Sequence, residues 1–155
     1  MTHDANRRVV QAFYDAVAAF DLDTIATCFA PNIEWTCFAP IEVIPYSGRH
    51  RGLESVMKIY RGMRENFVVL TRYAPEVLLV DGDKAAAVVS VAGVHRPHNR
   101  MSSHQILQFM RLEHAKISQF RVWMDSIDTI QQRIGREIDL TPEQQLHASP
   151  GLQPA

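Results

Sequence analysis

The hydrophobic pattern of this 155-residue chain changes its period near Phe67, and that change limits the folds open to it. Before Phe67, apolar residues recur every three or four positions, which is typical of amphipathic helices. After it, apolar and polar residues tend to alternate, which is typical of strands with one buried face. We predict helices over residues 8–21 and 53–66, with a short helix between them that Asp23 caps.

The second half of the chain predicts a series of strands, and the first half adds one more. Strands are expected at 33–38, 67–73, 76–80, 84–95, 101–113 and 117–125, and a loop is expected at 40–52. Pro75 divides two of these strands as an edge or bulge residue. Because helices segregated from an antiparallel sheet define the α+β class, we expect three N-terminal helices on a strongly curved antiparallel sheet. A cone-shaped apolar pocket should lie between the two layers.

The composition fits one soluble domain, which we assign to residues 1–140. Hydrophobic residues make up 46% of the chain, and the formal net charge of −1 gives no attraction to nucleic acid. No apolar run is long enough to span a membrane. Two cysteines without metal-type spacing favour a reduced, cytoplasmic protein. Residues 141–155 begin with a capping-box pattern, so we expect a short helix there, followed by a disordered tail.

Polar residues gather on one face of the hairpin that the last two long strands should form. Arg121, Trp123 and Asp125 alternate along the final strand and therefore share a face. A two-residue turn would place Gln108 opposite Arg121 and His104 opposite Asp125, and a turn shifted by one residue gives the same face. Only an odd-length loop or a β-bulge would reverse this arrangement.

Asp125 has two interpretations. In a partly apolar pocket its pKa should rise, which suits proton transfer near neutral pH, and His104 could orient it or take its proton. Arg121 would favour the ionised carboxylate instead. Asp125 could equally be the N-cap of a helix, because the apolar residues of 127–134 have helical spacing.

Four segments resemble one protein family in their order and spacing. They are Phe-Asp-Leu-Asp-Thr-Ile-Ala-Thr-Cys-Phe-Ala at 20–30, a strand with Trp35, Tyr-Ser-Gly-Arg-His-Arg-Gly at 46–52 and Trp-Met-Asp-Ser-Ile-Asp-Thr-Ile-Gln-Gln at 123–132. Together they resemble the SnoaL-like, polyketide cyclase-like branch of the superfamily that shares the nuclear transport factor two and ketosteroid isomerase fold. The resemblance implies a dimeric cone of three helices on a curved sheet. It also implies an acid/base aspartate at Asp125, as in cyclase-type members.

The resemblance does not extend to the catalytic residues of ketosteroid isomerases. Their oxyanion tyrosine falls at Phe13, although Tyr14 is adjacent. Their general-base aspartate falls at Cys37, and their protonated, hydrogen-bond-donating aspartate falls at Gln108. Since that mechanism needs a carboxylic acid kept neutral by an apolar site, we do not expect isomerase chemistry of that kind.

We therefore predict a cofactor-free acid/base enzyme of cyclase, isomerase or lyase type that acts on a small hydrophobic carbonyl compound. The expected catalytic residues are Asp125 and His104, with Gln108 donating a hydrogen bond to the substrate oxygen. The expected substrate-binding residues are Gln108, Trp35, Trp123, Tyr14, Tyr60, Arg121 and Cys37. The alternatives are a protein that binds a hydrophobic ligand without turnover and a dimerisation domain whose cavity is filled by side chains such as Met57, Tyr60 and Trp123.

Two further expectations concern partners. An apolar outer face of the sheet must be covered, which predicts a homodimer through that face. His95, His98 and His104 lie close enough in sequence to suggest a metal site. Because Arg96 and Arg100 alternate with them and would repel a cation, we expect a solvated loop and no metal.

Overall fold

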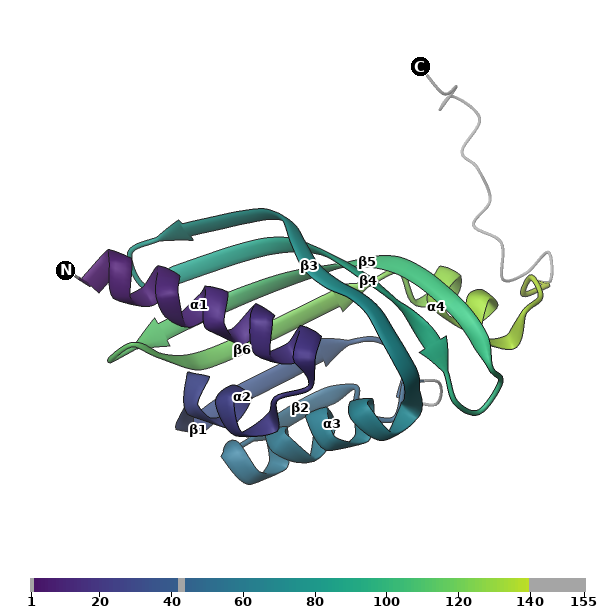
Figure 1. Cartoon of the computed structure of the whole chain (residues 1–155), viewed down its shortest axis with the longest axis horizontal. Helices are drawn as coiled ribbons and strands as arrows, with labels where there is room; N and C mark the ends of the chain where they lie inside the picture. Colours follow the sequence, from purple (N-terminus) through teal and green to yellow (C-terminus); the bar gives the residue numbers. More distant parts are fainter. Residues whose placement is uncertain (1, 42–43, 140–155) are drawn as a thin grey trace, which may run out of the picture.

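The structure is a computed structural model that describes residues 2–41 and 44–139. The elements, in chain order, are α1 (Thr2–Ala19), α2 (Leu22–Cys28), β1 (Phe29–Phe38), β2 (Gly48–Arg51), α3 (Leu53–Asn66), β3 (Phe67–Asp81), β4 (Lys84–His95), β5 (Arg100–Glu113), β6 (Lys116–Met124) and α4 (Ser126–Ile134) (Figure 1). The short helix and tail expected at 141–155 lie outside the described residues.

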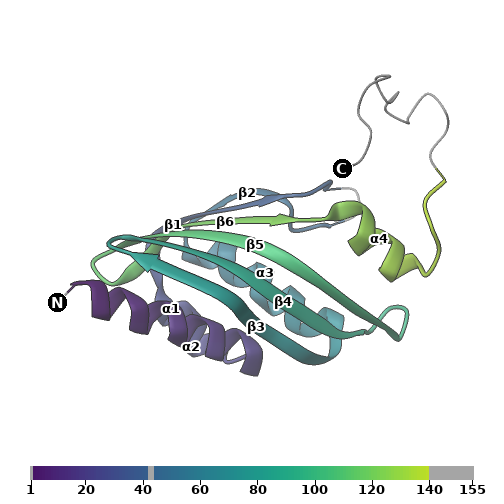
Figure 2. The ribbon, with the colours of Figure 1, turned by 90° about the horizontal axis from the view of Figure 1, so that it is seen from above.

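Six strands form one curved sheet in the order β2-β1-β6-β5-β4-β3. Figure 2 shows α1, α2 and α3 lying together on one side of this sheet, with α4 at the end where β6 stops. All neighbouring strands run antiparallel except β1 and β6, which are parallel. The α+β class and the curved sheet over three N-terminal helices are confirmed, and α4 is a fourth helix.

The helices form where the apolar spacing predicts them, except that α1 starts at Thr2, six residues before the expected start at residue 8. On α1, Val10, Phe13 and Val17 lie on one stripe and are fully buried against the sheet. The helix α2 is capped two residues earlier than expected, because the carboxylate of Asp21, and not of Asp23, accepts a hydrogen bond from the Thr24 backbone N–H at 3.1 Å. No helix in the described part of the chain is long and apolar enough to cross a membrane.

Two strands differ from the expected pattern. The expected loop at 40–52 contains the short strand β2, which pairs with β1. The strands expected at 67–73 and 76–80 are one continuous strand, β3, with a register shift between Pro75 and Val77. Proline is tolerated there because β3 is an edge strand, so its missing N–H costs no hydrogen bond to a further strand.

The turn between β5 and β6 has the predicted length. His114 and Ala115 both have positive φ, 50° and 54°, as a two-residue hairpin turn matched to strand twist requires. Glu113 accordingly pairs with Lys116. Up to this point the register is the one that the sequence predicts.

A β-bulge then reverses the faces of β6. Leu112 pairs with Ile117, but the next residue of β5, Arg111, pairs with Gln119. Ser118 is therefore the extra residue, and its hydroxyl donates a hydrogen bond to the Arg111 carbonyl at 3.2 Å. Because side chains alternate along a strand, this one residue moves every later side chain of β6 to the opposite face.

The predicted face is therefore wrong for the end of β6. Gln108 pairs with Val122 in place of Arg121, and Ile106 pairs with Met124 in place of Trp123. The inward-facing residues of β5 and β6 are buried, and they are Ile106, Gln108, Met110, Phe120 and Val122. The outer face carries the alternate residues, which include Arg121 and Trp123.

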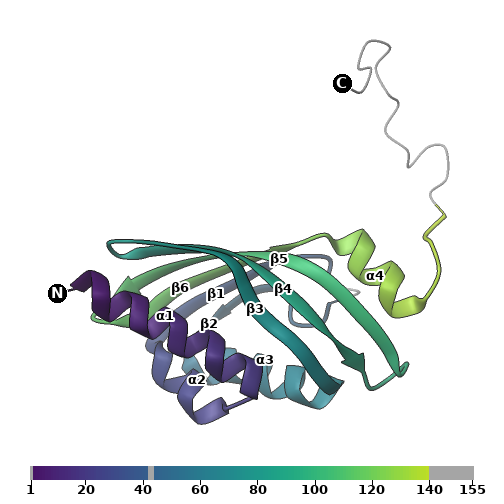
Figure 3. The ribbon, with the colours of Figure 1, turned by 45° about the horizontal axis from the view of Figure 1, so that its top comes forward.

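Apolar side chains are exposed on this outer face. Leu107 is 54% exposed, Phe38 46% and Trp123 38%. The rings of Phe38 and Trp123 stack at 4.8 Å between centroids. Figure 3 shows the strands β1, β6 and β5 side by side, so these residues form one surface, which we call the outer apolar patch (Phe38, Leu107 and Trp123).

Candidate functional site

A cavity lies between the helices and the sheet, and we call it the cone cavity. Its lining residues are Trp35, Tyr46, Tyr60, Met63, Phe67, Tyr73, Val91, His104, Ile106, Gln108, Phe120, Val122, Met124 and Arg133. Its empty volume is about 500 Å³ including the mouth, but only about 40 Å³ is open to the centre of a water molecule. It is therefore a narrow space lined by aromatic and aliphatic side chains, smaller than the roughly 300–1,000 Å³ of typical ligand pockets.

The mouth of the cone cavity lies beside α4. Tyr46, Met63, Phe67 and Arg133 line both the cone cavity and a second hollow that continues outward past the turn between β4 and β5. These four residues come from the segment before β2, from α3, from the start of β3 and from α4. A ligand that enters along this route must pass the guanidinium of Arg133.

Inside the cavity, three buried side chains form a directed chain of hydrogen bonds. The Tyr14 hydroxyl donates to Gln108 Oε1 at 3.0 Å, and Gln108 Nε2 donates to the Tyr73 hydroxyl oxygen at 2.7 Å. The hydroxyl hydrogen of Tyr73, which lines the cavity, is then left to donate to a ligand. Donation along such a chain polarises each successive group, which strengthens the last donor.

The tyrosines of this site stay protonated at neutral pH. Burial raises the pKa of Tyr14 and of Tyr73 above the ordinary value, although the Gln108 amide opposes the rise at Tyr73. Burial also raises the pKa of Tyr60 and of Tyr46. The hydroxyls of Tyr46, Tyr60 and Tyr73 can therefore act as hydrogen-bond donors in the cavity, and the Tyr14 hydroxyl already donates to Gln108 behind it.

His104 is the ionisable group of the cavity that can accept a proton. It lies on the inward face of β5, and its Nδ1 is buried with no hydrogen-bond partner among the described residues. Burial lowers the pKa of His104, the guanidinium of Arg133 lowers it further, and Asp128 partly opposes this. The imidazole is therefore neutral at pH 7, the form in which it can act as a base.

The helix α4 is held against the sheet by specific hydrogen bonds. The carboxylate of Asp125 caps its first turn by accepting from the Asp128 backbone N–H at 3.0 Å. In its last turns, Gln132 accepts from the Ser103 backbone N–H at 2.7 Å and donates to the Ser103 carbonyl at 2.8 Å. This pair of bonds fixes α4 beside β5 and so places Arg133 at the cavity mouth.

The structure corrects the expected positions of three residues. Asp125 is exposed, does not line the cone cavity and caps α4, so its expected place in that pocket is wrong and the capping interpretation is right. Asp125 and His104 do both line a separate, open hollow beside the end of β6. Arg121 and Trp123 lie on the outer side of the sheet for the same reason, the bulge at Ser118.

The other expected site residues lie in or near the cone cavity. Trp35, Tyr60, His104 and Gln108 line it, and Tyr14 is buried behind Gln108. Cys37 is buried but does not line the cavity, and it contacts the Ser47 hydroxyl at 3.8 Å. Burial raises the pKa of the Cys37 thiol, which disfavours a nucleophilic role. Of the residues expected to fill the space, only Tyr60 lines it, and Met57 and Trp123 do not.

Sequence reasoning missed Tyr46, Tyr73 and Arg133. Tyr73 lies in an edge strand whose bulges obscure its alternation, so no local pattern marks it as inward-facing. Arg133 had a usable signal, because it follows Thr129 by four residues and therefore shares the face of α4 that packs on the sheet. A cation on the buried face of a helix favours a ligand-binding role over a structural one.

His95 is a buried histidine with neighbours of its own. His95 Nε2 lies 2.8 Å from the Ser102 hydroxyl, and its ring packs on Phe67 at 4.3 Å between centroids. Burial, followed by the charge of Arg133, lowers the pKa of His95 from 6.5 to about 4. Within residues 2–41 and 44–139, no group of three or more His, Cys, Asp or Glu side chains is placed to hold a metal ion.

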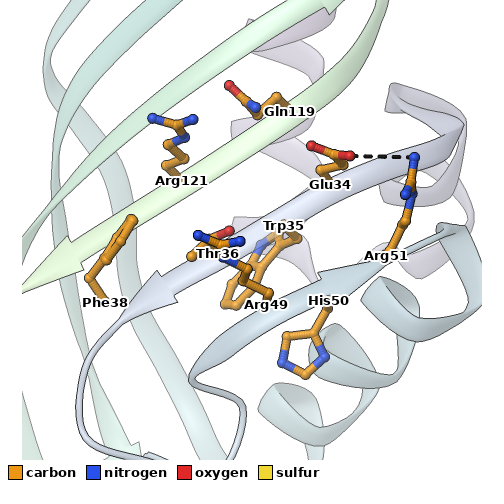
Figure 4. A pocket seen from close by; sticks show the side chains of 9 residues that line it. All are labelled: Glu34, Trp35, Thr36, Phe38, Arg49, His50, Arg51, Gln119 and Arg121. Atoms are coloured by element: carbon orange, nitrogen blue, oxygen red, sulfur yellow. Dashed lines mark ion pairs between the residues drawn. The ribbon is translucent and has the colours of Figure 1, made fainter.

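A separate groove runs over the outside of β1, β2 and β6, and we call it the outer groove. It is lined by Glu34, Trp35, Thr36, Phe38, Arg49, His50, Arg51, Gln119 and Arg121 (Figure 4). Arg51 pairs with Glu34 at 3.5 Å, but both side chains are more than half exposed, so the pair contributes little. The charges of the outer groove are solvated, and neither Tyr73 nor His104 lines it. We therefore take the cone cavity, which both residues line, as the candidate functional site.

Comparison with known proteins identifies relatives of this fold. The SnoaL-like domain family matches residues 10–120. The crystal structure of the "Putative Isomerase from Rhodopseudomonas palustris" is 26% identical over 88% of this chain and 100% of that chain, with a TM-score of 0.76. An NTF2-like protein of unknown function from Burkholderia pseudomallei is 21% identical over 83% of this chain and 96% of its own, with a TM-score of 0.72. An LEH-like epoxide hydrolase from M. tuberculosis is 16% identical over 86% and 92%, with a TM-score of 0.69. No curated protein matches the sequence.

Proposed function

This chain belongs to the SnoaL-like family, and from that premise we propose that it is a cofactor-free acid/base enzyme acting on a small hydrophobic carbonyl compound. One observation carries the proposal. A neutral histidine with an unpartnered nitrogen and a tyrosine hydroxyl at the end of a hydrogen-bond chain line the same apolar cavity. A base and an oxyanion donor in a mostly apolar site are the two groups that enolisation needs.

In the proposed reaction, His104 removes a proton from the carbon next to the substrate carbonyl. The electrons of the broken C–H bond move into the carbonyl group and leave negative charge on its oxygen. Tyr73 donates its hydroxyl hydrogen to this oxygen, and the chain through Gln108 and Tyr14 strengthens that donor. Return of the proton to another carbon gives isomerisation, attack of the enolate on a second carbonyl gives cyclisation, and loss of a leaving group gives a lyase reaction.

This assignment differs from the sequence hypothesis in two roles. His104 takes the role of base that was expected for Asp125, because Asp125 lies outside the cavity. Gln108 acts through Tyr73, because its Nε2 already donates to that hydroxyl. Gln108 is therefore a positioning residue, and Trp35 and Tyr60 supply flat walls around the substrate.

Deuterium exchange tests the proposal directly. Two flat ketones, neutral 2-tetralone and anionic phenylpyruvate, are incubated with the protein in D2O, and loss of the proton signal next to the carbonyl is followed by NMR. We expect His104→Gln to lower the enzymatic exchange rate by about 100-fold or more, the range for a general base. The rate should also fall as the pH drops through the lowered pKa of His104, because a protonated imidazole cannot accept a proton.

The matched control is Asp125→Asn. Asparagine is also a good N-cap, so the variant keeps α4 in place while removing the carboxylate. We expect its exchange rate to equal that of the wild type, and a loss comparable to that of His104→Gln would restore Asp125 as the base. Binding of either ketone without exchange would instead favour the alternative function, a hydrophobic-ligand-binding protein without turnover.

We also propose that the chain forms a homodimer through the outer apolar patch. The support is the exposure of Phe38, Leu107 and Trp123 on adjacent strands, which is a surface that a monomer would leave in water. A second copy of the same patch is self-complementary about a two-fold axis.

A further inference from the structure

We infer that the ligand of the cone cavity is a flat hydrophobic anion whose acidic oxygens, of a carboxylate or an enolate, bind between Arg133 and Trp35. The inference rests on the proposed function in one respect, that the cone cavity is the ligand site. It adds the charge of the ligand and the residues that recognise it.

Unpaired donors are the first reason. Trp35 Nε1 and Arg133 Nε are buried, and neither makes a hydrogen bond of good geometry with a described residue. The Trp35 indole does lie near the Tyr60 hydroxyl, and the Arg133 guanidinium lies near the Tyr46 hydroxyl, so Arg133 Nε is the donor left without any neighbouring acceptor. Both groups can only donate, and both residues line the cone cavity. Leaving a buried donor unpaired is costly, so native proteins rarely do it without a purpose. A ligand with acceptor oxygens would satisfy both groups.

The balance of donors and acceptors points the same way. Besides Trp35 and Arg133, the cavity presents the hydroxyls of Tyr46, Tyr60 and Tyr73, which remain protonated at neutral pH. The amide oxygen of Gln108, a strong acceptor, is already occupied by Tyr14. The neutral His104 imidazole supplies one free acceptor, so donors outnumber free acceptors in the cavity, which favours a ligand that is mainly an acceptor.

The charges around the cavity favour an anionic ligand over a neutral one. None of the described lining residues carries a carboxylate, and Arg133 forms no salt bridge with a described residue. Its guanidinium acts on groups inside the cavity, because it opposes the burial that raises the pKa of Tyr46 and it lowers the pKa of His104. A planar guanidinium also matches the geometry of a carboxylate, which it can bind with two parallel hydrogen bonds.

The shape of the cavity defines the rest of the ligand. Trp35 and Phe120 are paired neighbours on β1 and β6, and their rings lie nearly parallel, with centroids 6.3 Å apart and an interplanar angle of 4°. Together they form one flat wall of the cavity. Tyr60 and Tyr73 add further aromatic surface. Walls of this kind in so narrow a space favour a flat, unsaturated or aromatic body over a bulky one.

The arginines of the outer groove do not offer the same selectivity. Arg51 there is paired with Glu34, and both side chains are solvated, so an anion would gain little over water. Arg133 is set apart by having its Nε buried and unpaired at the mouth of an apolar cavity.

The test compares an acid with its uncharged isostere. trans-Cinnamate and trans-cinnamamide have the same flat body and cannot enolise, so their binding is independent of turnover. Dissociation constants are measured by calorimetry at pH 7 for the wild type, for Arg133→Gln and for the control Arg136→Gln, which removes an exposed charge just after α4. We expect the wild type and Arg136→Gln to prefer cinnamate by about tenfold or more, the effect of one hydrogen bond to a charged group.

In Arg133→Gln, the preference for the acid should disappear, and cinnamamide should bind as it does to the wild type. Equal affinity of the wild type for acid and amide would overturn the inference, and this result needs no variant. So would binding of neither compound, or a preference that survives in Arg133→Gln. If the binding test contradicts the anion inference while exchange of 2-tetralone still depends on His104, the proposed enzyme activity stands. Conversely, selective binding of cinnamate without exchange of either ketone would reject the proposed enzyme activity and support the anion site.

Discussion

Replacing Gln108 with methionine should destabilise the protein through the two tyrosines that it joins. Gln108 accepts from Tyr14 at 3.0 Å and donates to Tyr73 at 2.7 Å, and all three side chains are buried. Methionine has a similar volume, so the change removes hydrogen bonds and leaves little cavity. The Tyr14 hydroxyl would then be a buried donor without a partner, which costs about 1–3 kcal/mol.

The loss of stability from the unpaired Tyr73 hydroxyl should be smaller than that from Tyr14, because the Tyr73 hydroxyl faces the cone cavity, where a water molecule can reach it. Adding about 1 kcal/mol for this second hydroxyl gives a total loss of about 3 kcal/mol in the free energy of unfolding. Urea denaturation followed by far-UV circular dichroism, at one protein concentration for all variants, measures this quantity.

The triple variant Tyr14→Phe, Gln108→Met, Tyr73→Phe separates hydrogen bonding from packing. It removes the unpaired hydroxyls along with their partner, so it should regain about 1–2 kcal/mol relative to the single variant. A single variant within about 1 kcal/mol of the wild type would refute the hydrogen-bond argument, because two orphaned hydroxyls cannot cost so little. A triple variant less stable than the single one would show that packing, and not polar satisfaction, dominates this site.

Three other predictions follow from the described contacts. Asp125→Ala should lose about 1 kcal/mol of stability through the missing cap while Asp125→Asn stays near the wild type, as thermal or urea unfolding would measure, and equal losses would contradict the capping role. The pKa of His95 is lowered from 6.5 to about 4 in the folded protein, so the unfolded chain binds a proton at a higher pH than the folded chain does. The stability that depends on the neutral imidazole is therefore present above pH 6.5 and is lost as the pH falls to 4. This loss should reach up to about 3 kcal/mol and should shrink in His95→Gln when unfolding is measured at pH 7 and pH 4.5, whereas an unchanged pH dependence would exclude His95 as its source. Trp123→Glu should convert the proposed dimer to a monomer in analytical ultracentrifugation, whereas Leu79→Glu, an exposed residue on the edge strand β3, should not, and a monomeric wild type would end the dimer proposal.

The local patterns of the sequence were sufficient for the elements and for the class of fold. The stripe of Val10, Phe13 and Val17 predicts a helix because those positions meet on one side of a 3.6-residue turn. The alternation after Phe67 predicts strands, and the two-residue turn at His114 and Ala115 is one of the two positions that the sequence analysis allowed. These features depend on neighbours in the chain, so a single sequence contains the information.

The composition of the site depended on contacts that no local pattern contains. One extra residue in β6, Ser118, reversed the face of Arg121 and Trp123, because a two-residue repeat turns any single insertion into an exchange of inside and outside. In the observed register, the polar partners of Gln108 are Tyr73 on the edge strand β3 and Tyr14 on α1.

Which residues lie at the mouth of the cavity also depended on tertiary contacts. Asp125 carries the same capping signal in the sequence and in the structure, but only the hydrogen bonds between Gln132 and the Ser103 backbone show where the capped helix lies. That docking brings Arg133 over the cavity and turns Asp125 away from it. The sequence by itself offered Asp125 as a possible cap for the helix that begins at Ser126. The tertiary structure decided which of its side chains meets a ligand, because the direction of a helix face depends on what the helix packs against.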